Sequence, residues 1–212
     1  MAHLRSLVGG GVRATSLPRN DELVSLVAPA KSGDSRAIRT LVTALGPSLL
    51  RVVRRVLGSG NADEDDVTQD AMFAVLRALP EFRAECSVLH FACRIAVLTA
   101  MNARRRHVVR RRFTEPAGPD EASTAVSLLP SPAARVEQNE LRDQLRELLA
   151  ELPLPQAEAL AMHCVLGYSI AETAAVCGAP LNTVRSRLLA AKTALRKRVL
   201  EAGTLESVGG AL

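Results

Sequence analysis

The sequence predicts an all-α protein made of two small helical domains joined by a flexible linker. Apolar residues form 48% of the chain and are mostly Leu, Val and Ala, whereas aromatic residues form only 2%, a balance that favours helices over sheets. Alternating runs of Val, Ile, Thr and Tyr, which would indicate strands, do not occur. A proline-rich segment near the middle separates two groups of helical patterns.

The first domain is expected at residues 21–112, after a flexible leader at 1–20 that contains three consecutive glycines. Apolar residues recur with a helical period, and proline or glycine interrupts each pattern. We expect four helices: from about 21, limited or kinked by Pro29; from 35 to 57, bent at 46–47; over 63–79, ending at Pro80; and from Ser87 into an arginine run at 104–112.

The linker is expected at residues 113–135, where five prolines and glycines oppose both helix formation and burial. The second domain follows at 136–201, with a tail at 202–212. Its helices are predicted at about 136–151, 155–166, 169–176 and 182–200. The chain is therefore predicted to be two helical domains on a tether.

Residues 169–184 give the strongest local signal, because two short helical patterns flank a tight turn at Gly178. This arrangement is typical of a helix-turn-helix. The inward stripe of its second helix is predicted to be Val184, Leu188, Ala191 and Leu195. The side chains that remain for DNA are Asn182, Thr183, Arg185 and Ser186 for base reading, and Arg187 and Lys192 for phosphates. An ordinary basic surface helix is the alternative interpretation.

Charge is distributed unevenly along the chain. The net charge is +5, yet acids concentrate at 61–70 and bases at 104–112 and 185–198, which predicts two kinds of partner. Six arginines at 104–112 repel one another unless they are solvated or paired with anions, and phosphate is the natural anion. A solvated cationic helix end is the simpler alternative.

Five blocks, in this order, resemble the extracytoplasmic-function sigma factors of bacterial RNA polymerase: DVTQDAMF at 66–73, LPEFR at 79–83, FACRIA at 91–96, LP at 152–153 and GYSIAE at 167–172. The resemblance covers most of the chain. It implies that 21–112 is sigma region 2 and 136–201 is sigma region 4. It also implies an alternative sigma factor without catalytic activity, which binds core RNA polymerase and directs promoter recognition, DNA melting and transcription initiation.

The resemblance also assigns residues to partners. Docking on the clamp helices of the largest polymerase subunit falls to Asp66, Gln69, Asp70 and Phe73. Contact with the minus-ten promoter element falls to Arg83, Arg94, Asn102, Arg104, Arg105 and Arg106, and the helix-turn-helix reads the minus-thirty-five element. The family commonly has Trp and Tyr where this chain has Phe91 and Cys93. Two-domain members of this family are often held inactive by an anti-sigma factor, so an anti-sigma factor is a candidate partner.

Two other functions fit parts of the sequence. A stand-alone helix-turn-helix regulator would bind DNA through the second domain only. Its first domain would be a ligand or phosphorylation receiver domain with alternating strands and helices, whereas residues 21–112 show only helical patterns. A metal enzyme or redox sensor could use Cys86, His90 and Cys93, but a fourth ligand is not evident nearby. We therefore expect reduced thiols, no metal and no cofactor. Because no apolar run approaches the length of a bilayer span, we expect a cytoplasmic protein without membrane insertion.

Overall fold

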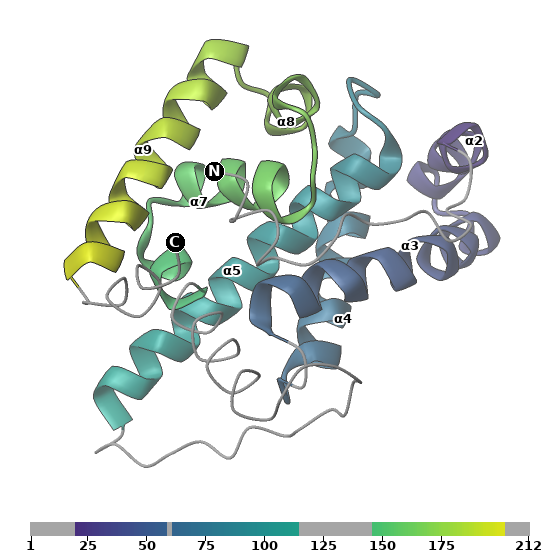
Figure 1. The fold of residues 1–212 in the computed structure, drawn as a ribbon. Helices are drawn as coiled ribbons and strands as arrows, with labels where there is room; N and C mark the ends of the chain where they lie inside the picture. The colour runs from purple at the N-terminus through teal and green to yellow at the C-terminus, as the bar shows by residue number, and fades with distance from the viewer. Residues whose placement is uncertain (1–19, 59–60, 115–145, 202–212) are drawn as a thin grey trace, which may run out of the picture.

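The computed structural model describes residues 20–58, 61–114 and 146–201, and all regular structure in these ranges is helical (Figure 1). The all-α prediction is therefore confirmed. The elements are α2 (Asn20–Lys31), α3 (Ser35–Leu57), α4 (Glu64–Ala78), the 3-10 turn η1 (Leu79–Glu81), α5 (Val88–Thr114), α7 (Leu154–Leu160), the π-helix η2 (Ala161–Val165), α8 (Ile170–Cys177) and α9 (Leu181–Glu201). Residues 146–151 form a further helical turn. The predicted leader up to residue 19, the tail, nearly all of the predicted linker and residues 136–145 of the helix predicted at 136–151 lie outside the described residues.

Helices α2 to α5, here called the amino-terminal domain, form one bundle around a core of branched side chains. Leu49 and Val53 of α3, Val75 of α4 and Val97 of α5 are at most 1% exposed. Asp34 caps α3 by accepting a hydrogen bond from the backbone N–H of Arg36 at 2.8 Å. The four helices predicted for the first domain are therefore present, close to their expected positions.

Two prolines lie inside helices, at the positions where the sequence predicts a limit or a bend. Proline lacks an N–H and crowds the carbonyl four residues earlier, so it usually ends or kinks a helix. Pro29 lies two residues before the end of α2, close to the predicted limit, and α3 continues through Pro47 as one helix over the predicted range. The buried stripes of α3 on both sides of Pro47 explain this continuity, because packing outweighs one missing hydrogen bond.

Residues 146–201, here called the carboxy-terminal domain, contain the predicted helix-turn-helix. Ser169 begins α8 with a capping box: its hydroxyl accepts from the Glu172 N–H at 3.1 Å, and the Glu172 carboxylate accepts from the Ser169 N–H at 2.8 Å. Gly178, at φ +59°, ends α8 in the left-handed region. The predicted inward stripe of α9 is confirmed, with Val184, Leu188, Ala191 and Leu195 at most 7% exposed.

The helix predicted at 155–166 is not a single α-helix. It changes after Leu160 into the π-helix η2, in which the Leu166 N–H donates to the Ala161 carbonyl at 2.9 Å. Beyond it, the Tyr168 N–H donates to the Met162 carbonyl at 3.1 Å. This wider turn sets the position of Tyr168 immediately before α8.

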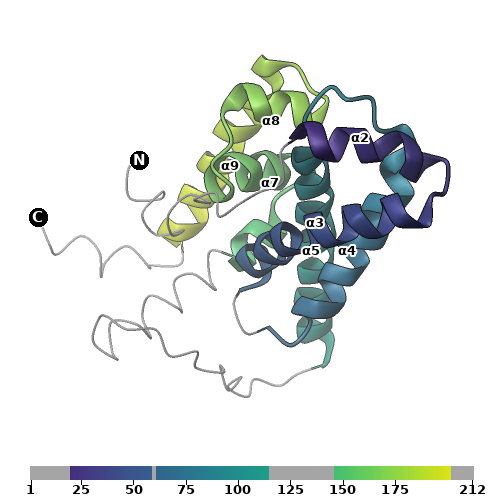
Figure 2. The same cartoon turned by 90° about the vertical axis from the view of Figure 1, so that its right-hand side faces the viewer.

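The two domains pack against each other, which the prediction of two tethered domains did not anticipate. Figures 1 and 2 show α5 between α3 and α4 on one side and α7 and α8 on the other. Buried residues from both domains form one continuous apolar cluster. Helix α5 is therefore the shared wall of the two domains.

Candidate nucleic-acid and polymerase interfaces

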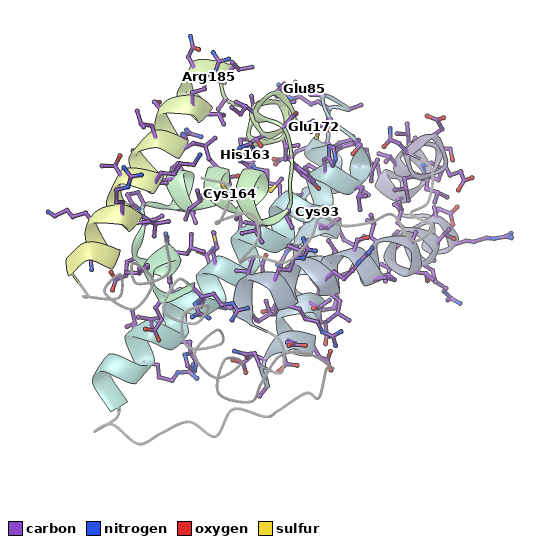
Figure 3. All side chains as sticks on the ribbon, viewed as in Figure 1. Glu85, Cys93, His163, Cys164, Glu172 and Arg185 are labelled. Atoms are coloured by element: carbon purple, nitrogen blue, oxygen red, sulfur yellow. The ribbon has the colours of Figure 1, made fainter. Side chains whose placement is uncertain are left out.

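The amino-terminal end of α9 presents its polar side chains to solvent. Asn182, Arg185 and Ser186 are exposed, and Thr183 is half-buried. One Arg185 guanidinium nitrogen donates to Asn182 Oδ1 at 3.2 Å, which links two of the predicted base-reading residues. Figure 3 shows Arg185 projecting from the start of α9, away from the rest of the molecule. This end of α9 is free to enter a DNA groove.

Further along α9, basic residues flank this end. Arg187 and Lys192 are half-buried, and each adds a positive charge to this helix. A helix that offers polar groups at its start and cations beside them has the layout of a recognition helix. The structure therefore brings together the six residues predicted on α9.

Helix α4 carries a second exposed surface, here called the α4 stripe, formed by Asp66, Gln69, Asp70 and Phe73. All four are exposed, and their spacing of three and four residues places them on one face. Phe73 is 52% exposed, although the aromatic ring is apolar. The opposite face buries Val67, Ala71 and Val75 in the bundle. An exposed aromatic ring among carboxylates is typical of a protein-binding surface.

The loop before α5 contains Arg83, which is exposed. Helix α2 holds this loop at both ends: Lys31 Nζ donates to the Phe82 carbonyl at 2.8 Å, and the Val88 N–H donates to Asn20 Oδ1 at 3.2 Å. Inside the loop, Ala84 has φ +59°, a left-handed conformation that is uncommon for a residue with a Cβ. The sequence reasoning missed this role of α2, because the contacts join residues more than fifty positions apart.

The candidate minus-ten residues of α5 differ in their surroundings. Asn102 and Arg106 are exposed, as expected for DNA contact. Arg94, Arg104 and Arg105 are half-buried and bind other parts of the chain. One Arg104 nitrogen donates to the Leu57 carbonyl at 3.0 Å, within the amino-terminal domain. The structure therefore does not bring the six residues together on one open surface.

Arg94 and Arg105 bind the carboxy-terminal domain. Arg94 Nε lies 2.5 Å from Glu158 Oε1 in an ion pair. Arg105 donates to the Ala150 carbonyl at 3.0 Å and, through its other nitrogen, to the Leu152 carbonyl. These contacts fix α5 against α7 and the turn before it.

Sequence reasoning missed Glu158, which is only 5% exposed. Its position in the buried run Ala157–Leu160 was a usable signal, because a carboxylate among buried apolar residues requires a partner. The side chain also accepts a hydrogen bond from the Cys177 thiol, whose pKa is raised to about 12, chiefly by burial and then by Glu158. Cys177 is therefore a neutral thiol that helps to hold the carboxylate.

A cleft of about 280 Å³ lies where α3 and α5 meet the chain between η2 and α8. His90 of α5 packs on Tyr168 with ring centroids 4.3 Å apart, and Tyr168 hydrogen-bonds the Cys93 thiol. Burial lowers the pKa of His90 and raises that of Cys93. Arg51 and Arg55 line the same cleft. Tyr168 is therefore a packing residue between the domains.

The cysteines do not form a metal centre in the described part of the chain, where no three His, Cys, Asp or Glu side chains converge as ligands. None of the four cysteines, all of which lie in the described ranges, forms a disulfide. Cys86 lies in the loop before α5 and not in a helix, and burial raises its pKa. None of the helices in the described ranges is long and apolar enough to cross a bilayer.

Comparison with known proteins gives the same two-part division. Residues 41–110 match the family model Sigma-70 region 2, and residues 142–195 match Sigma-70, region 4. The ECF RNA polymerase sigma factor SigC of Mycobacterium tuberculosis (strain CDC 1551 / Oshkosh) is 31% identical over 182 residues, covering 85% of this chain and 94% of that protein. The ECF RNA polymerase sigma-E factor of Escherichia coli (strain K12) is 29% identical, covering 82% and 92%.

A solved structure of CnrH in complex with the cytosolic domain of CnrY aligns with a TM-score of 0.49 at 26% identity, over 84% of this chain and 96% of that one. The sequence matches establish the family. This chain belongs to the extracytoplasmic-function group of the sigma-70 family of RNA polymerase sigma factors. Its function is that of an alternative sigma factor, which directs transcription initiation. The stand-alone regulator is therefore the wrong alternative, because the first domain matches sigma region 2.

Proposed function

We propose that the α4 stripe is the surface through which this sigma factor binds the clamp helices of the largest subunit of core RNA polymerase. The observation that carries the proposal is Phe73, a large aromatic side chain that is 52% exposed on the same face of α4 as Asp66, Gln69 and Asp70. Burying an exposed ring in a partner surface adds more binding energy than most polar contacts. The carboxylates would steer and orient a basic partner.

Promoter contacts are divided between the two domains in this proposal. The exposed start of α9 reads bases of the minus-thirty-five element through Asn182, Thr183, Arg185 and Ser186, while Arg187 and Lys192 hold phosphates. The loop residue Arg83 and α5 receive the minus-ten element. Their cations are Arg94, Arg104, Arg105 and Arg106, with Asn102 as a polar neighbour. These contacts bind and position DNA, and no catalytic step is assigned to the chain.

The minus-ten surface has few aromatic side chains for an unstacked base. Phe91 is half-buried and packs on Phe82, with ring centroids 5.0 Å apart, and Cys93 is buried. A flipped base loses stacking and pairing, which aromatic side chains usually replace. We therefore expect this sigma factor to melt promoters weakly and to require close matches at both promoter elements.

The direct test is initiation in vitro. Purified chain is added to sigma-free bacterial core polymerase with a pool of promoter fragments, and new transcript starts are mapped. Starts that require both components are the expected result, and they reveal the promoter. Polymerase that shows no stable association with the chain would contradict the proposal.

Matched variants locate the polymerase surface. Asp66→Asn and Asp70→Asn each remove one exposed charge from the α4 stripe and should weaken association with core polymerase. Asp21→Asn removes one exposed charge from α2 and should leave association unchanged. Equal effects of all three would show a general charge effect and not a docking site.

The compartment and one partner follow from the same function. Bacterial RNA polymerase acts in the cytoplasm, so we place this sigma factor there. An anti-sigma factor is the further partner that the family resemblance implies.

A further inference from the structure

The cleft of about 280 Å³ beside Tyr168, here called the α3–α5 cleft, has the composition of a site for a small molecule. Its volume lies near the lower end of the range for such sites, which is roughly 300–1,000 Å³. Its apolar walls come from three segments: Val52 of α3, Leu89 of α5 and Leu166 before α8. Apolar walls with a few polar groups between them are usual where a protein binds a small ligand.

The cations of the cleft are Arg51 and Arg55, one helical turn apart on α3. Arg51 Nε donates to the Pro47 carbonyl at 3.1 Å, and a terminal nitrogen donates to the buried Ser48 hydroxyl at 3.1 Å. Both acceptors are uncharged, so these bonds orient the guanidinium group without neutralising it. One Arg55 nitrogen donates to the Val165 carbonyl at 3.0 Å. Two cations one turn apart repel each other, and an anion in contact with both relieves this repulsion.

The other titratable groups of the cleft are uncharged at neutral pH. Burial lowers the pKa of His90 and raises the pKa values of Cys93 and Tyr168. None of the described residues that line the cleft is Asp or Glu. Glu172 of α8 favours the charged form of His90 from outside this lining, and its carboxylate already accepts from the Ser169 N–H at 2.8 Å. The lining therefore carries positive charge.

We infer that the α3–α5 cleft binds a small phosphate monoester, with the phosphate on Arg51 and Arg55 and the organic group against the apolar walls. A phosphate monoester carries about −1.5 to −2 charges at pH 7, which matches two cations. Guanidinium groups bind phosphate oxygens through paired N–H donors. A carboxylate offers the same kind of contact with only one charge, so it is the weaker match.

The site is separate from the surfaces proposed for polymerase and promoter DNA. None of the residues that line the cleft is among the residues assigned to the α4 stripe, to the minus-ten element or to α9. A bound phosphate monoester would therefore be an additional ligand of the sigma factor. Its binding can be measured without polymerase or DNA.

The test titrates the full-length chain with phenyl phosphate in a calorimeter. Phenyl phosphate joins one phosphate monoester to a small apolar ring. Inorganic phosphate lacks the ring, and benzoate carries a single charge. We expect saturable binding of one phenyl phosphate per chain, with weaker binding of the other two anions. Equal affinity for inorganic phosphate would overturn the role of the apolar walls, and tighter binding of benzoate would overturn the assignment of phosphate.

Matched variants of α3 locate the anion. Arg51→Gln removes one cation from the cleft and should weaken phenyl phosphate binding about tenfold, as for the loss of a hydrogen bond to a charged group. Arg39→Gln makes the same charge change at an exposed position of α3 outside the cleft and should leave the affinity unchanged. Equal affinities of the two variants would overturn the inference.

A second variant keeps the inference falsifiable if Arg51→Gln folds poorly. Leu89→Trp enlarges a half-buried wall residue without changing charge, so it should fill part of the cleft. It should weaken phenyl phosphate binding about tenfold, because the ring would then overpack the site. Unchanged affinity would place the ligand elsewhere and overturn the inference.

Tyr168 reports occupancy of the cleft directly, because it is the only tyrosine of the chain. In protein with isotope-labelled tyrosine, the NMR signals of this ring should shift and saturate at the dissociation constant found by calorimetry. Saturable heat with unshifted ring signals, or no saturable binding of phenyl phosphate, would overturn the inference. Transcript starts with core polymerase are a separate readout, so a chain that initiates normally but binds no phenyl phosphate refutes only this site.

Discussion

The two surfaces proposed for DNA contain the same residue types but differ in what covers them. On α9, Asn182, Arg185 and Ser186 point into solvent. On α5, Arg94 and Arg105 bind oxygen atoms of the carboxy-terminal domain. Arginine is proposed to contact DNA in one place and binds the other domain in the other place. Charge pattern alone therefore does not separate a free binding surface from an occupied one.

The difference has a functional consequence. An open surface can bind its partner without any change in the chain, so its substitutions should alter binding and leave stability nearly unchanged. A covered surface must first lose its internal partner, so its substitutions should alter binding and domain packing together. The α4 stripe belongs with α9 in this respect, because all four of its side chains are exposed.

The largest effect is expected for Phe73→Ala, which tests whether the α4 stripe is open. It should cost about 2 to 3 kcal/mol of binding free energy with core polymerase, as for a central aromatic anchor. Because the ring is 52% exposed, the free energy of unfolding should fall by only about 1 kcal/mol. Binding titrations and urea denaturation measure the two quantities, with Val24→Ala on α2 as a control that leaves binding unchanged. Equal losses in both would place Phe73 in the structural core.

On the open surface of α9, Arg185→Ala should lower discrimination at one upstream base pair by about 1 to 3 kcal/mol. Lys192→Ala should weaken binding more uniformly, because a phosphate contact does not read sequence. Transcription from promoters that carry each base at every minus-thirty-five position measures the difference. If both variants lowered activity equally on all promoters, the division between base reading and phosphate contact would be wrong.

A smaller effect is expected at the start of α8, which packs against the covered face of α5. Ser169→Ala removes one half of the capping box and should lower the free energy of unfolding by about 1 kcal/mol. Ser186→Ala is the control, because its hydroxyl bonds only the Thr183 carbonyl of its own helix, at 2.9 Å. Thermal denaturation compares the two variants. A Ser169→Ala protein as stable as the control would show that the cap contributes nothing.

The smallest effect is a pH dependence of domain packing. Burial keeps the pKa of His90 below its usual 6.5, although Glu172 of α8 favours the charged ring; Arg51 and Arg55 of α3 and Tyr168 line the same cleft. The packed form therefore holds a neutral imidazole, and the separated form binds more protons below pH 6.5. The two domains should be fully packed above pH 6.5, and their packing should weaken as the pH falls below 6.5 and His90 becomes protonated. Small-angle scattering should show a larger radius of gyration at the acidic end, and His90→Gln should remove this change.

Local sequence patterns predicted the fold well. The helical period of α9 identified its buried stripe. Ser87 and Gly178 predicted the start of α5 and the end of α8, and both lie there in the structure. The Ser87 hydroxyl accepts a hydrogen bond from the His90 N–H at 3.1 Å. The helix predicted at 35–57 is α3, which tertiary packing carries through Pro47. The π-helix at Ala161–Val165 leaves no sequence signal of its own.

The candidate sites were predicted less completely. The α4 stripe follows from helix spacing alone, and it is exposed as a docking surface requires. The contacts of Arg94 and Arg105 could not be predicted, because their partners lie 64, 45 and 47 positions away along the chain. A resemblance to relatives predicts which partner a residue binds, but it does not predict what that residue contacts in the free chain.

The most direct test of this account is the distance between the two domains before and after polymerase binding. Spin labels are placed through unnatural amino acids at the exposed positions Glu22 of α2 and Thr193 of α9, so that the native cysteines stay unlabelled. Pulsed dipolar spectroscopy should give a single narrow distance for the free chain and a longer one with core polymerase and promoter DNA. A broad distribution in the free chain, unchanged in Glu158→Gln, would contradict the packed arrangement and the coverage of α5.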